Sequence, residues 1–186
     1  CCAQCDAVRC AAVTLNLEDP VTALTEEIRI TSLTSSEALL LSIYRQWLRG
    51  LECQDSRYWE RAWREAARAG GGNAGRAALS SLECLLRRIA AHALRRVSYH
   101  PPCCGYLADD ERLLLGAVAG AGSAQGDLLL TKLVRAEGLG EVREAAATLA
   151  EAFAEGGCGL RTAASGAQPW QGVDLHELAP ASSRLH

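Results

Sequence analysis

The residues best suited to chemistry in this chain stand together at 99–105, where a histidine, two prolines and two adjacent cysteines form the order His-Pro-Pro-Cys-Cys. Imidazole and thiolate groups are preferred ligands of Zn²⁺, and a thiol can also be oxidised reversibly. Proline fixes φ and lacks a backbone donor, so the two prolines must end the preceding helix and hold the connector extended. His100, Cys103 and Cys104 are therefore candidate metal ligands on a stiff connector.

Local spacing does not complete a zinc site, because a structural zinc ion takes four ligands. Cys84 or His92, on the preceding helix, would have to supply the remaining zinc ligands. The alternative is that His100 bonds to the end of that helix while the two cysteines of the connector fill small buried spaces. We favour this packing arrangement and keep zinc binding or a redox-responsive thiol as alternatives. A Cys–His catalytic pair lacks an assignable orienting acid and oxyanion hole, so no catalytic residue is predicted.

A second group of cysteines stands at the beginning of the chain, at Cys1, Cys2, Cys5 and Cys10. The spacing of Cys2 and Cys5 is that of a zinc knuckle or of half an iron–sulfur site. The second ligand pair of a zinc finger is missing, so a flexible cysteine-rich end is favoured. The nine cysteines in 186 residues are an odd number, which argues against a secreted domain stapled by disulfides and favours a reducing cytoplasm.

Aromatic residues suggest a surface for association. Trp59 and Trp63 are four residues apart and share one face of a predicted helix, close in sequence to Trp47. Tryptophan is enriched at the centres of protein interfaces, although burial in the core is its default position. Trp59 and Trp63 are therefore candidate interface residues.

The helix that carries the candidate ligands Cys84 and His92 also has a basic face. Arg88, His92 and Arg96 are spaced by four, and such a face could contact phosphate groups. The net charge of −3 and the absence of a helix-turn-helix signature favour instead a solvated face paired with acids of a neighbouring helix.

Six amphipathic helices must position these residues. Thr34 and Glu37 form a capping box before an apolar stripe that runs from Leu40 to Leu51, and Arg45 is expected on the opposite, polar side. A glycine-rich break at 70–75 separates the second helix from the third. The helices are predicted at about 34–51, 56–69, 76–97, 109–120, 127–138 and 141–155.

The order of these elements predicts an all-α, single-domain helical bundle over residues 34–156. The cysteine-rich segment 1–33 is expected to be irregular, and 157–186 to be a loosely structured tail. A content of 49% hydrophobic and 22% charged residues is typical of a globular domain. No apolar run approaches the roughly 18 residues that span a bilayer. Arginine greatly outnumbers the single lysine, Lys132, as in GC-rich bacterial coding sequence.

These patterns favour a non-enzymatic bacterial protein of the cytoplasm that acts by association, as a regulatory, adaptor or homo-oligomeric module. Its expected partner is another protein or a second copy of itself, with no nucleic acid and no membrane involved. The alternative is a zinc-binding or redox-responsive protein that uses His100, Cys103 and Cys104.

Overall fold

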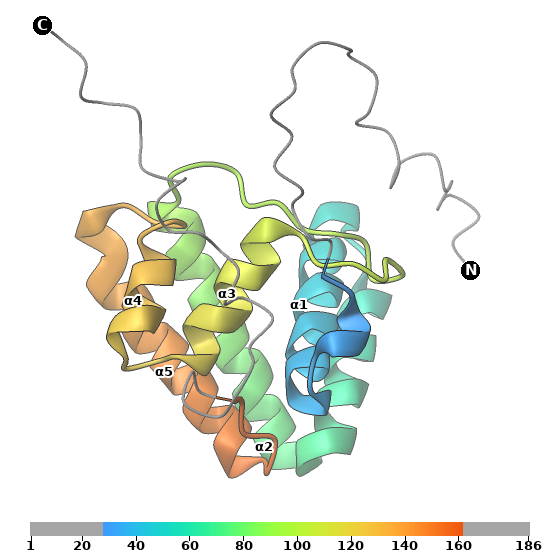
Figure 1. Cartoon of the computed structure of the whole chain (residues 1–186). Helices are drawn as coiled ribbons and strands as arrows, with labels where there is room; N and C mark the ends of the chain where they lie inside the picture. The colour runs from blue at the N-terminus through green and yellow to red at the C-terminus, as the bar shows by residue number, and fades with distance from the viewer. Residues whose placement is uncertain (1–27, 162–186) are drawn as a thin grey trace, which may run out of the picture.

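Five α-helices and two short 3-10 turns make up the computed structural model, which describes residues 28–161 (Figure 1). No β-strand occurs within this range, so the predicted all-α bundle is confirmed. No helix within it is both long and apolar enough to cross a bilayer. The N-terminal cysteine group and the predicted tail after residue 161 lie outside the described residues. The helices are α1 (Ser35–Cys53), α2 (Ser56–His92), α3 (Asp109–Ala119), α4 (Ala124–Leu130) and α5 (Leu139–Glu155), and the turns are η1 (Ile30–Ser32) and η2 (Ala136–Gly138).

The start of α1 is fixed by the predicted capping box. The Thr34 hydroxyl accepts a hydrogen bond from the backbone N–H of Glu37 at 3.3 Å, and the Glu37 carboxylate accepts one from the N–H of Thr34 at 2.8 Å. Two backbone donors that the first helical turn cannot satisfy are thus bonded. The apolar stripe that follows is buried as expected at Leu40, Ile43 and Tyr44, whereas its last member, Leu51, is 47% exposed.

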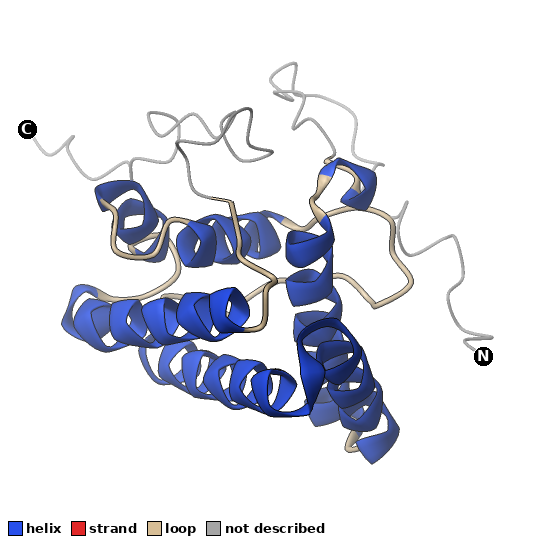
Figure 2. Ribbon diagram, turned by 90° about the horizontal axis from the view of Figure 1, so that it is seen from below, coloured by secondary structure: helices blue, strands red, loops and turns tan. Residues whose placement is uncertain are grey.

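The second and third predicted helices are the two halves of α2, which is counted as one helix although it is kinked at Gly71, so the bundle has five helices and not six. The predicted glycine break appears as a sharp bend at Gly71, whose φ of 84° and ψ of 167° are not helical. Glycine adopts this conformation without the steric cost that a side chain would bring. The N-terminal half of α2 forms a hydrogen bond with α1 through Glu65 and Ser42, and the C-terminal half forms an ion pair with α5 through Arg88 and Glu141. Figure 2 shows the same bundle of helices and loops turned by 90° from the view of Figure 1.

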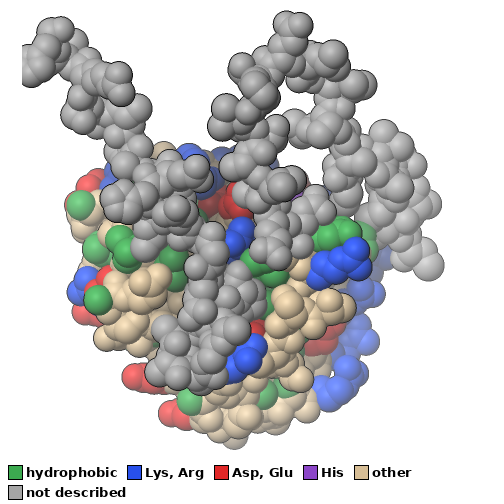
Figure 3. Space-filling model, viewed as in Figure 1, with side chains coloured by type: hydrophobic (Ala, Val, Ile, Leu, Met, Phe, Trp, Pro, Cys, Tyr) green, Lys and Arg blue, Asp and Glu red, His purple; other side chains and the backbone are tan. Residues whose placement is uncertain are grey.

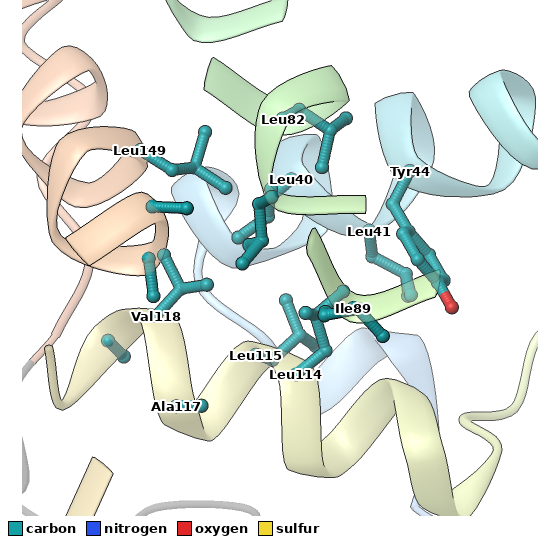
Figure 4. Packing of buried hydrophobic residues seen from close by; sticks show 14 of the residues in the cluster. Leu40, Leu41, Tyr44, Leu82, Ile89, Leu114, Leu115, Ala117, Val118 and Leu149 are labelled. Carbon is teal, nitrogen blue, oxygen red and sulfur yellow. The ribbon is translucent and has the colours of Figure 1, made fainter. Parts of the chain in front are cut away.

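A single apolar cluster, to which all five helices contribute, forms the core (Figure 4). Removing this surface from water is the main stabilisation of the bundle. The completely buried members are Leu40, Ile43, Ala62, Leu82, Leu85, Val118, Val142 and Leu149.

The helix predicted to reach Val97 ends at His92. The next residue, Ala93, forms an isolated antiparallel bridge with Val134, and the N–H of Arg135 donates to the carbonyl of His92 at 2.9 Å. These bonds between distant segments take the place of further helical turns. The chain from 93 to 108 is an extended connector that crosses one end of the bundle (Figure 1).

The predicted basic helix face is therefore wrong, because Arg95 and Arg96 lie on the connector and not on α2. The expected pairing with acids of other helices is confirmed, since Arg88 contacts Glu141 of α5 and Arg95 contacts an acid of α3. Figure 3 shows acidic and basic side chains interspersed over one face, with basic ones gathered along the edge beside α1.

The bend in α2 leads to a testable prediction about stability. A Cβ atom on Gly75 would lie 2.7 Å from the backbone nitrogen of Ala67, so Gly75→Ala must open the bend. We expect a loss of about 1–3 kcal/mol in the free energy of unfolding, measured by urea denaturation. The control is Gly72→Ala, where nothing lies within 4 Å of the added Cβ and stability should stay equal or rise. Equal stability of the two variants would contradict the tight bend.

Candidate functional site

The connector is tied to the bundle by the guanidinium of Arg45, which is 1% exposed. Its Nε and Nη2 donate to the two carboxylate oxygens of Glu111 on α3, at 2.7 and 2.6 Å. Its Nη1 and Nη2 also donate to the connector carbonyls of Cys104 and Tyr106, at 2.7 and 2.5 Å. The expectation that Arg45 faces solvent is wrong, because its charge is fully paired inside the protein, as burial requires.

Glu111 is completely buried and binds the connector as well. It accepts hydrogen bonds from the backbone N–H groups of His100 at 3.0 Å and Ala108 at 2.8 Å. The acids at 109–111 stand where the fourth helix was predicted to begin. Glu111 stabilises the start of that helix by accepting a hydrogen bond from the N–H of Ala108, the residue before the first turn, and it also fixes the path of sixteen connector residues, 93–108, at two points.

Asp110, also completely buried, holds the connector at Arg95 and Ser98. Both of its oxygens accept from the Arg95 guanidinium, at 2.6 and 2.7 Å, and one also accepts from the N–H and hydroxyl of Ser98. Burial by itself would raise the pKa of Asp110. The hydrogen bonds from Arg95 and Ser98 outweigh burial and hold that pKa below its ordinary value.

The candidate metal ligands lie on this anchored connector. Cys103 is exposed, Cys104 is buried and His100 is half-buried. Cys84 is exposed on α2, and His92 lies at the end of that helix, packed over Gly138. Within residues 28–161, no group of three or more His, Cys, Asp or Glu side chains is arranged to hold a metal ion. The zinc hypothesis thus gains no geometric support from the part of the chain that is described.

Trp47 on α1 and Trp59 and Trp63 on α2 are all half-buried, but they have different neighbours. The rings of Trp47 and Trp59 are in contact, with centroids 6.1 Å apart, and the indole N–H of Trp59 donates to the Trp47 carbonyl at 3.2 Å. Trp59 lies directly against Gly50, where a Cβ would overlap the indole. Trp63 lies instead below the guanidinium of Arg76, 5.9 Å from the ring centroid. Trp59 and Trp63, which were predicted to share one interface, therefore lie in two different environments.

Trp47 and Trp59 open onto a large apolar cavity between α1, the C-terminal half of α2, the connector and α3, which we call the tryptophan cavity. Its volume of about 860 Å³ falls within the range of small-molecule sites in proteins. The charged residues of its lining are Glu83, Arg87, Arg95, Arg96 and Asp110. The uncharged residues are Tyr44, Trp47, Leu48, Leu51, Trp59, Leu86, Ile89, Ala90, Ala93, Val97, Leu114 and Leu133.

One residue of this lining, Tyr44, carries a buried polar group of special interest, its hydroxyl. The side chain is 1% exposed, and its oxygen has no hydrogen-bond partner among the described residues. Figure 4 shows this oxygen directed away from Leu40, at the edge of the apolar cluster. Burial, followed by the nearby charges of Glu111 and Asp110, raises the pKa of Tyr44, so the hydroxyl keeps its proton and can donate it.

Sequence reasoning placed Tyr44 correctly on the buried stripe but did not identify the cavity. The only signal in the sequence was a phenol at a position where a leucine would fill the core equally well. No protein-family model matches this chain, and no curated protein or solved structure shows significant similarity to it. The geometry of the site therefore carries the functional argument.

The buried pair of Arg45 and Glu111 can be tested by removing the acid. Glu111→Gln leaves the Arg45 charge buried without a counter-ion, and we expect a loss of about 3–5 kcal/mol in unfolding free energy. Glu141→Gln breaks the solvent-exposed contact with Arg88 and should cost no more than about 1 kcal/mol. Urea denaturation of both variants measures the difference. Similar small losses would show that Arg45 is not the anchor of the connector.

The lowered pKa of Asp110 predicts how stability depends on pH. Because the pKa of Asp110 is lower in the folded state, its ionised carboxylate stabilises the fold at pH values above the unfolded-state pKa of about 3.9. This contribution is lost as the pH falls through the still lower folded-state pKa. Arg95→Gln should therefore cost about 1–2 kcal/mol at pH 7, because Arg95 is partly exposed, and the difference from wild type should shrink below pH 4.

The control for that measurement is Arg68→Gln, an exposed residue that forms no ion pair within the described part of the chain. Its unfolding free energy should follow that of the wild type at every pH. A difference between Arg95→Gln and wild type that stays constant down to pH 2 would contradict the role assigned to Asp110.

Proposed function

We propose that this protein is a non-enzymatic module that works by association, and that the tryptophan cavity binds the apolar part of its ligand. The cavity combines a volume suited to a small molecule with walls of aromatic and aliphatic side chains. Its apolar surface continues outward at Leu51, a large hydrophobic residue that is 47% exposed. Large exposed apolar residues next to a cavity are typical of binding surfaces.

The observation that carries the proposal is the apolar lining of the cavity, which includes Tyr44 with its buried hydroxyl. A buried hydroxyl with no partner costs about 1–3 kcal/mol of stability. A ligand that places a hydrogen-bond acceptor beside Tyr44 recovers this free energy on binding, while its apolar part lies against Trp47 and Trp59. The chemistry of the cavity therefore favours a small, mainly apolar molecule with at least one acceptor group.

The broader expectations from the sequence remain predictions. These are association with a protein partner or a second copy through Trp59 and Trp63, and a location in a bacterial cytoplasm. The alternative of zinc binding or thiol redox chemistry at His100, Cys103 and Cys104 ranks below the cavity, because no described group of side chains supports it geometrically.

The test uses decan-1-ol, a neutral chain with one oxygen, in a calorimetric titration of the full-length protein. The wild type should bind it saturably. Tyr44→Phe removes only the hydroxyl, so we expect affinity to fall about three- to tenfold while the free energy of unfolding stays equal or rises. Tyr106→Phe, a half-buried tyrosine outside the cavity, is the matched control and should bind normally.

A second variant tests the location of the bound chain. Leu86→Trp places a larger side chain in the wall of the cavity and should abolish binding, whereas Leu128→Trp on the exposed side of α4 should not. Circular dichroism confirms that both variants are folded. Lack of decan-1-ol binding by the wild type, or equal binding by Leu86→Trp, would overturn the proposed function.

A further inference from the structure

A smaller, more polar hollow of about 420 Å³ adjoins the tryptophan cavity. The two share Arg96 and Val97 in their linings, which places both residues where the hollows meet. The remaining lining of this outer hollow comes from the end of α1 and from the connector. It consists of Arg49, Glu52, Ser98, Tyr99 and Pro101.

The charges around the two hollows are nearly balanced by ion pairs, with one cation left over. Three of the four arginines contact an acid: Arg49 with Glu52 at 2.7 Å, Arg87 with Glu83 at 2.5 Å, and Arg95 with Asp110 at 2.6 Å. Arg96, which lines both hollows, forms no ion pair with any residue between 28 and 161.

Glu52, the acid of the outer hollow, is engaged mainly by Tyr99 and Arg49, and Arg96 acts on it only as a nearby charge without an ion pair. The Glu52 carboxylate accepts a hydrogen bond from the Tyr99 hydroxyl at 2.8 Å and another from Arg49 at 2.7 Å. These two bonds, that from Tyr99 first, lower the pKa of Glu52, so the acid stays ionised and engaged with them. The excess positive charge lies at the boundary between an apolar and a polar hollow.

We propose that the ligand of this site is a free, single-chain amphipathic carboxylate, whose chain enters the tryptophan cavity while its carboxylate binds Arg96 at the outer hollow. This inference rests on the proposed function, since the chain occupies the same cavity, and it adds the chemical class of the ligand. The carboxylate is a polar group additional to the acceptor beside Tyr44, so decanoate tests Arg96 and decan-1-ol tests Tyr44. A guanidinium binds a carboxylate through paired, charge-assisted hydrogen bonds. Arg96 is exposed, so the carboxylate keeps part of its hydration and the cost of desolvation stays small.

The experiment compares decanoate, below its micelle concentration, with decan-1-ol, which has the same chain without the charge. The wild type should bind decanoate about tenfold more tightly than decan-1-ol, and added salt should reduce this preference. Arg96→Gln should remove the preference and leave decan-1-ol binding unchanged. Arg68→Gln, which removes the same charge on an exposed part of α2 outside both hollows, should keep it.

The outcomes separate this inference from the proposed function. If decan-1-ol binds as tightly as decanoate and Arg96→Gln changes neither, the anionic class is wrong while the cavity remains a binding site. If neither probe binds, the proposed function fails and this inference fails with it. Binding to vesicles of anionic phospholipid, without binding of monomeric decanoate, would also overturn it in favour of a membrane surface.

Discussion

The ion pair between Arg45 and Glu111 is the contact on which the rest of this structure depends. It joins the middle of α1 to the first turn of α3, and the same two side chains bind four backbone groups of the connector. A charge pair removed from water is stable only when nearly every remaining donor and acceptor is also bonded. Here the connector supplies those bonds, so the path of an irregular segment is coupled to the packing of two helices. Asp110 extends the same arrangement to Arg95 and Ser98.

The cavity is a consequence of this anchoring. A connector held by its backbone to α1 and α3 cannot collapse into the space between α1 and the C-terminal half of α2. Its residues Ala93, Val97 and Arg96 instead form one wall of that space. The bend at Gly71 contributes from the other side, because it directs the two halves of α2 to different neighbours. The apolar lining thus lies in a gap that the core side chains do not fill, and Tyr44 is part of that lining.

The positions of the helices were largely predictable because their signals are local. The capping box at Thr34 and the three-and-four spacing after it depend on residues within one or two turns, and both are found in the structure. The start of α3 and the extent of α5 were predicted by the same kind of signal. The end of α2 was not, because Ala93 leaves the helix to pair with Val134, forty-one positions later in the numbering. Helix periodicity contains no information about such a partner.

By itself, then, the sequence determined the all-α class, the glycine break and most of the buried stripe, since apolar periodicity and capping act over a few residues. Only the tertiary structure decided the site. Arg45 occupies a polar position of its helix, which normally faces solvent, and it is buried because its partner Glu111, 66 residues away, is brought opposite to it. Likewise, Arg96 differs from the other three arginines of the two hollows only because each of those forms an ion pair with an acid. Pairing between distant charges is a property of the folded arrangement, and no local pattern specifies it.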